Sequence, residues 1–89
     1  MDAEEKLLEA GYEGVKFFVN YSYDDALIGV SDDGRAIYDY DRMVEWLMDE
    51  EGCSYDEAAD WVNYNTIRAL SYMGEGKPII MYSLAYLGE

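Results

Sequence analysis

The sequence predicts a small α+β domain in which helices pack on one face of a mainly antiparallel sheet. Three observations lead to this fold class. Segments with apolar residues at helical spacing follow residues that cap helices, and runs of β-branched and aromatic residues lie between turn signals. A length of 89 residues suffices for one domain with a single core. The expected order of elements along residues 1–89 is α-β-β-β-α-α-β.

The N-terminal part of the chain predicts a helix followed by a strand. Asp2 is a typical N-cap for a short amphipathic helix, and Gly11 can end that helix. Residues 15–21 combine β-branched and aromatic side chains, which favour an extended conformation. A strand is therefore expected at this segment.

Three further strands are predicted, two of which form a hairpin. Residues 26–30 and 36–40 are rich in apolar side chains, and the five residues between them include Asp33 and Gly34. This pair accepts the positive φ values that tight turns need, so the two runs are expected to pair as antiparallel strands. Near the end of the chain, residues 78–82 predict the last strand, which begins with a proline that a first strand position tolerates.

Two helices are expected between the hairpin and the last strand. Asp41 is the expected N-cap of the first, and Gly52 is its expected C-terminal stop. Apolar residues recur between them at steps of three and four residues, as in an amphipathic helix. Ser54 and Glu57 have the spacing of a capping box and begin the second of these helices, which is expected to reach about residue 71.

That helix contains an unusual polar stretch at residues 63–66, where Asn and Thr are weak helix formers. We expect Asn65 or Thr66 to tie the helix to a strand end or loop through side-chain hydrogen bonds. The functional alternative is a polar recognition patch in which Arg68 pairs with a carboxylate of a partner or of the chain itself.

Charge is the main functional signal, because 20 acidic and six basic residues give a formal net charge of -14. Nine carboxylates lie between residues 39 and 60, where Arg42 is the only base. Such a surface repels nucleic acid and anionic membranes and attracts proteins that bind phosphate groups. We therefore expect a protein partner and no direct binding of nucleic acid or membrane. The carboxylates expected to bind the partner are Asp39, Asp41, Glu45, Asp49, Glu50, Glu51, Asp56, Glu57 and Asp60, with Asp32 and Asp33 at the hairpin turn.

Part of this charge has a spacing that suits phosphate mimicry. Asp41, Glu45 and Asp49 are four residues apart, so on a helix they form a stripe with steps of about 6 Å. The phosphates of a DNA strand have a spacing of similar order. An ordinary solvated helix face is the alternative, but such a face would normally include Lys or Arg partners at neighbouring helical positions.

The residue types present argue against catalysis. The chain has no His and one cysteine, Cys53, which excludes an internal disulfide and argues against a zinc or other transition-metal site. Residues 32–35 lack the ligand pattern of a calcium loop, and neither a nucleophile-elbow motif nor a phosphate-binding loop occurs. We expect a protein that is not an enzyme and uses no cofactor. Its acidic N-terminus lacks the features of a signal peptide and predicts a cytoplasmic location.

Four segments resemble a group of small acidic proteins from bacterial genomes and mobile elements: residues 26–30, 34–40, 43–47 and 64–70. The resemblance spans residues 24–82 and brings no catalytic residues with it. In size and acidity the chain is also similar to phage-encoded anti-CRISPR proteins, many of which imitate DNA. This similarity implies an inhibitor that acts in the bacterial host and blocks DNA binding by a Cas effector.

An intracellular adaptor or interaction domain, whose acidity serves only solubility, is the alternative from a different class. Ten tyrosines cannot all be buried in so small a core, so several should be exposed. Exposed tyrosines offer rigid contact area for a partner protein or for a homodimer. They do not favour binding of single-stranded nucleic acid, which needs a cationic groove.

Overall fold

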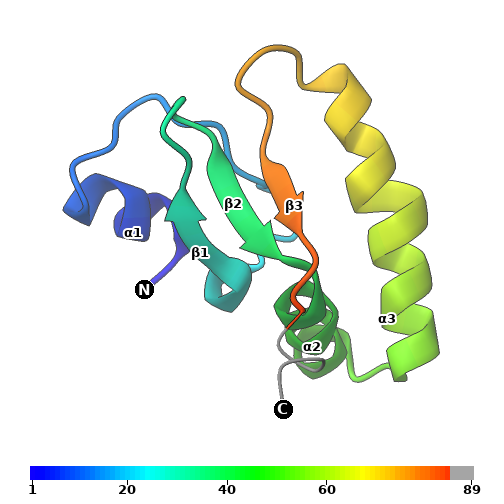
Figure 1. Ribbon diagram of the computed structural model, residues 1–89. Helices are drawn as coiled ribbons and strands as arrows, with labels where there is room; N and C mark the ends of the chain where they lie inside the picture. Colours follow the sequence, from blue (N-terminus) through cyan, green and yellow to red (C-terminus); the bar gives the residue numbers. More distant parts are fainter. Residues whose placement is uncertain (85–89) are drawn as a thin grey trace.

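The computed structural model describes residues 1–84 (Figure 1). The elements are helices α1 (Ala3–Glu9), α2 (Tyr40–Glu51) and α3 (Tyr55–Trp61), and strands β1 (Leu27–Val30), β2 (Ala36–Asp39) and β3 (Ile79–Met81). A 3₁₀ turn at Asp24–Ala26 precedes β1. After α3 the chain continues into a π-helix at Val62–Ile67 and a second 3₁₀ turn at Leu70–Tyr72. These elements confirm the α+β class and, apart from one strand, the predicted order.

The three strands of the described part of the chain form a sheet with β2 in the centre. β1 and β2 pair antiparallel, which confirms the predicted hairpin. β2 and β3 pair parallel, with Ile37 opposite Ile79 and Tyr38 opposite Ile80, so the sheet is mixed. The pairing is parallel because α2 and α3 connect the two strands and return the chain to the end of the sheet where β2 begins.

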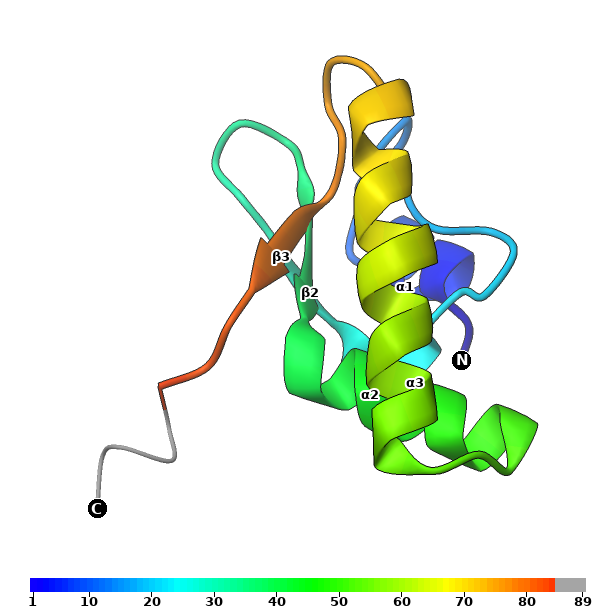
Figure 2. The ribbon, with the colours of Figure 1, turned by 90° about the vertical axis from the view of Figure 1, so that its right-hand side faces the viewer.

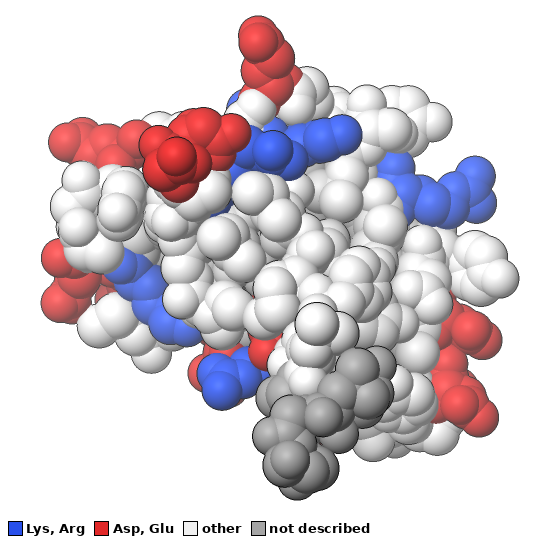
Figure 3. Space-filling view, viewed as in Figure 1, with Lys and Arg blue, Asp and Glu red and all other residues white. Residues whose placement is uncertain are grey.

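The helices lie on one face of the sheet, as predicted (Figures 1 and 2). In β2, Ala36 and Tyr38 are buried beneath the helices, whereas the alternating residue Ile37 is partly exposed on the other face. Figure 3 views the molecule from that other face, where charged side chains lie mostly around the rim and much of the centre is uncharged. The sheet therefore separates a helical layer from an exposed face with few charges.

An aromatic cluster forms the centre of the core. The ring of Phe18 lies 5.9 Å from that of Tyr23 and 4.8 Å from that of Tyr38, and Trp46 of α2 lies 5.3 Å from Tyr23. Such tilted and edge-to-face contacts add to the free energy gained by removing the rings from water. The other buried apolar residues are Ala3, Leu7, Ala26, Leu27, Ala36, Met43, Val44, Leu47, Ala58, Val62 and Pro78.

The strand predicted at residues 15–21 is wrong. Within residues 1–84 no backbone hydrogen bond joins this segment to another strand. The backbone amide of Phe18 instead donates a hydrogen bond to a side chain, the hydroxyl of Tyr38, at 3.2 Å. β propensity reports how well side chains suit a half-buried surface, and here that preference is met by burying Phe18 in the core rather than by strand pairing.

Helix caps follow the predicted chemistry, with one shift of position. Asp39, and not Asp41, is the N-cap of α2, and its carboxylate accepts from the amides of Asp41 and Arg42 at 3.0 and 3.4 Å. The capping box of Ser54 and Glu57 at the start of α3 is confirmed. The shift in α2 arises because β2 runs directly into the helix, so the residue that leaves the strand is also the one that caps.

Candidate protein-binding surface

The predicted carboxylate stripe lies on the exposed side of α2. Met43, Val44 and Leu47 are buried, which fixes the helix face that meets the core. Asp41, Glu45 and Asp49 are exposed and project from the opposite face at steps of four residues. We call these three residues the carboxylate stripe.

The carboxylates beyond the stripe occupy different parts of the two helices. Glu50 and Glu51 are exposed at the end of α2, and Asp56 and Asp60 are exposed on α3, which follows after a short connection. Because α2 and α3 pack against each other, these acids lie on two adjacent helices.

Asp39 and Glu57 have structural roles. Asp39 is partly buried, caps α2 and lies 3.9 Å from the Nε of Arg42. The Oε1 of Glu57 accepts from the amide of Ser54 at 3.0 Å. Hydrogen bonds with Ser54 favour the charged form, so the pKa of Glu57 is lowered from its ordinary value. Both carboxylates are accounted for by helix capping, whatever else they contact.

The hairpin acids lie apart from the others. The turn that holds Asp32 and Asp33 is at one end of β2, and α2 begins at the other end (Figure 1). Asp33 accepts from the hydroxyl of Ser31 and lies 3.9 Å from a guanidinium nitrogen of Arg35. The structure thus does not join these two acids to the surface of α2 and α3.

Few of the acids are neutralised within the molecule. The two ion pairs found in residues 1–84 involve Asp33 and Asp39, and none involves the carboxylate stripe. Three of the basic side chains donate to backbone carbonyls, and of these only Arg35 also makes an ion pair in residues 1–84: Lys6 donates to Asp24 and Leu27, Lys16 to Met73, and Arg35 to Lys77. These three cations therefore stabilise backbone segments outside α2 and α3, and the carboxylate stripe has no ion-pair partner among residues 1–84.

The polar stretch after α3 holds the helix to the rest of the fold, as the sequence predicts. Thr66 is buried, and its hydroxyl shares a 2.6 Å hydrogen bond with the hydroxyl of Tyr23. The hydroxyl of Tyr40 donates to Asn63 at 3.0 Å. Sequence reasoning missed that this stretch is a π-helix, a rare form that often occurs at functional sites.

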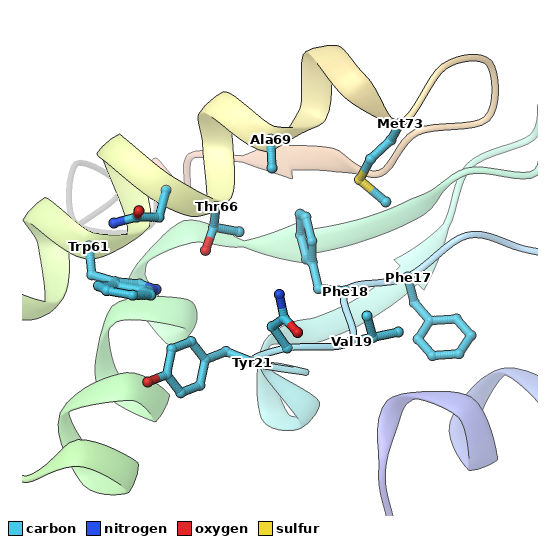
Figure 4. A pocket seen from close by; sticks show the side chains of 10 residues that line it. Phe17, Phe18, Val19, Tyr21, Trp61, Thr66, Ala69 and Met73 are labelled. Carbon is cyan, nitrogen blue, oxygen red and sulfur yellow. The ribbon is translucent and has the colours of Figure 1, made fainter.

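A groove runs between residues 17–21 and the helix that faces them (Figure 4). Its volume is about 270 Å³, and the helical wall includes Trp61, Asn65, Ala69 and Met73. We call it the Trp61 groove. Most of its lining is apolar, yet Trp61 is 44% exposed, so an aromatic surface faces solvent at one end.

A smaller pocket of about 190 Å³ lies beside this groove and shares Tyr21 and Trp61 with it. The two rings meet edge to face, with centroids 5.5 Å apart. Glu51 and Glu57 also line this pocket, which we call the Glu51 pocket. The pKa of Tyr21 is raised by partial burial and then by the negative charge of Glu51.

The two aromatic residues shared by the groove and the pocket, Tyr21 and Trp61, were not among the expected site residues. Tyr21 and Trp61 are far apart in the sequence, and their contact depends on the path of an unpaired segment. The only sequence signal was the combination of unexpectedly polar helix residues with many aromatics.

Within residues 1–84, the Cys, Asp and Glu side chains form no group of three or more that could hold a metal ion. No helix in that part of the chain has the length and apolar character needed to span a bilayer.

Comparisons with known proteins give no relative from which a function can be transferred. No protein-family model matches the sequence, and neither a curated protein nor a solved structure is significantly similar to it. Any functional assignment must therefore start from the surface itself.

Proposed function

We propose that the protein is an inhibitor that binds a nucleic-acid-handling protein, with a bacterial Cas effector as the foremost target, and blocks its DNA-binding surface. The observation that carries the proposal is the carboxylate stripe on α2. The carboxylate stripe is exposed, it is opposite the core face of α2, and no ion pair within residues 1–84 neutralises it.

Electrostatics would act mainly on association. A protein with a net charge of -14 is drawn toward a cationic channel at long range, which raises the association rate. Contacts between the stripe and Lys or Arg of the channel would then replace contacts that DNA phosphates make. Because these charges are exposed, binding should weaken as salt screens them.

An interaction domain of a different kind is the second candidate function. It is favoured by the large aromatic and aliphatic side chains that are exposed, of which Tyr72 is the extreme case at 90%. On this alternative the partner is recognised through apolar contacts, and the acidic residues keep the domain soluble.

The test compares two variants that lose the same charge at different places. D41N/E45Q/D49N neutralises the carboxylate stripe, and E4Q/E9Q/E13Q neutralises three exposed acids in and after α1. The wild type and both variants are each used to capture proteins from a lysate of a bacterium with active CRISPR systems, with washes at low and high salt. Bound proteins are identified by mass spectrometry.

The proposal expects a Cas effector or another DNA-handling protein to be captured by the wild type, released by salt and lost with the stripe variant only. The captured protein should also bind less DNA when the wild type is added. Equal capture by both variants would contradict the proposal, as would a salt-resistant partner without a nucleic-acid role, which would support the interaction domain.

A further inference from the structure

The Trp61 groove and the Glu51 pocket are adjacent cavities on the surface, and Tyr21 and Trp61 line both of them. They lie on either side of the Tyr21–Trp61 ring pair, whose edge-to-face contact positions both rings. The groove side is mostly apolar, whereas the pocket side has the carboxylates of Glu51 and Glu57. A ligand that lies across both cavities therefore meets an apolar site followed by an anionic one.

Within residues 1–84, the wall opposite the helix has backbone groups that pair with no other backbone group, although the Phe18 amide donates to the hydroxyl of Tyr38. Among the described residues, segment 17–21 has no backbone–backbone hydrogen bond, although its composition is that of a strand. Val19 is 75% exposed, and Asn20 is exposed beside it. An extended peptide can bind such a segment through main-chain hydrogen bonds, as in recognition by added strands.

The anionic end selects the charge of the ligand. The hydrogen bonds of Glu57 lower its pKa, so this carboxylate is ionised at neutral pH. No Lys or Arg lines either cavity in the part of the chain that the structure describes. A Lys or Arg side chain in the Glu51 pocket would meet two carboxylates and the rings of Tyr21 and Trp61, and aromatic rings also attract cations.

We propose that this surface anchors an extended basic segment of a partner protein, which places an apolar side chain in the Trp61 groove and a Lys or Arg in the Glu51 pocket. The inference rests on the proposed function, since it names how the cationic target is held. The carboxylate stripe would steer the encounter, while the groove would supply contact energy that salt affects less.

The experiment uses a displayed library of short random peptides selected against the full chain. Enriched peptides are synthesised with a fluorescent label, and their dissociation constants are measured by anisotropy. Three variants are compared: A69W, which fills the groove from an exposed position, E51Q/E57Q, which neutralises the pocket, and E4Q/E9Q, which removes the same charge from exposed positions on α1. Gln at position 57 keeps the capping hydrogen bond.

The expected peptides combine an apolar residue with Lys or Arg. A69W and E51Q/E57Q should each weaken their binding about tenfold or more, whereas E4Q/E9Q should change it less than about threefold. Three results would overturn the proposal: no enriched peptide, enriched peptides without a cation, or binding that A69W leaves unchanged. Circular dichroism of A69W checks that the variant is folded.

Failure of this inference can be told apart from failure of the proposed function. If the stripe variant loses the captured partner but A69W keeps peptide binding, only the anchor is wrong. If A69W abolishes peptide binding but the stripe variant still captures the same partner, the groove binds peptides and the DNA-mimic function is wrong.

Discussion

At the residue scale, Thr66 shows why a weak helix former occupies a helical position. Its hydroxyl meets that of Tyr23 in the core, and neither oxygen is left without a hydrogen-bond partner. Leaving a buried hydroxyl unpaired would cost more free energy than a residue of higher helix propensity at this position would gain. The residue is therefore explained by a contact distant in sequence.

Replacing Thr66 tests this explanation. T66V keeps the shape of the side chain but leaves the hydroxyl of Tyr23 unpaired, so the free energy of unfolding should fall by about 1–3 kcal/mol. T66S keeps a hydroxyl and should lose less. Urea denaturation measures both. Equal stability of T66V and the wild type would show that the hydrogen bond is not stabilising.

Tyr38 should make stability depend on high pH. Burial raises its pKa from 10.0 to about 12, with a smaller contribution from the charge of Asp24. Because the folded pKa is the higher one, the associated stability is fully present below pH 10 and is lost as the pH rises toward 12. The loss should reach at most about 3 kcal/mol.

The measurement is urea unfolding of the wild type and Y38F over that pH interval. Phe at position 38 cannot ionise, so the variant should lose less stability than the wild type as the pH rises, even though it also lacks the hydrogen bond with Phe18. Identical pH dependence in the two proteins would assign the loss to other tyrosines.

At the element scale, the start of α2 separates two neighbouring acids with different roles. Asp39 accepts hydrogen bonds from the first turn, whereas Asp41 is exposed and points away from the core. D39A should therefore reduce the free energy of unfolding by about 1 kcal/mol, and D41A by no more than a few tenths of that. Thermal or urea unfolding of the two variants gives the comparison, and an equal effect would contradict the assigned cap.

How far the elements follow from the sequence depends on the range of the forces that form them. The hairpin and the capping box of Ser54 are set by neighbouring residues, so local patterns predict them. The segment at 15–21 is decided by burial of Phe18 against distant rings, and the parallel pairing of β3 by the path of two helices. The contact of Tyr21 with Trp61 likewise requires the assembled fold, so the groove could not be predicted.

For the whole molecule, a charge of -14 means that folding works against repulsion among the acids. Raising the NaCl concentration from about 0.05 to about 0.5 M should screen this repulsion and raise the melting temperature. D41N/E45Q/D49N should be more stable than the wild type at low salt and gain less from added salt. Calorimetry would contradict this account if salt lowered the melting temperature of both proteins equally.

The parallel pairing of β2 and β3 has a consequence for the folding rate. The chain between these strands contains the acid-rich helices α2 and α3. Pairing of β3 with β2 therefore closes a long loop and, in the same step, brings the like charges of these helices together. The β1–β2 hairpin, by contrast, closes locally and can form early. Added salt should therefore raise the refolding rate by a larger factor than it lowers the unfolding rate, and stopped-flow mixing measures both. If salt changed only the unfolding rate, β3 would pair with β2 after the rate-limiting barrier.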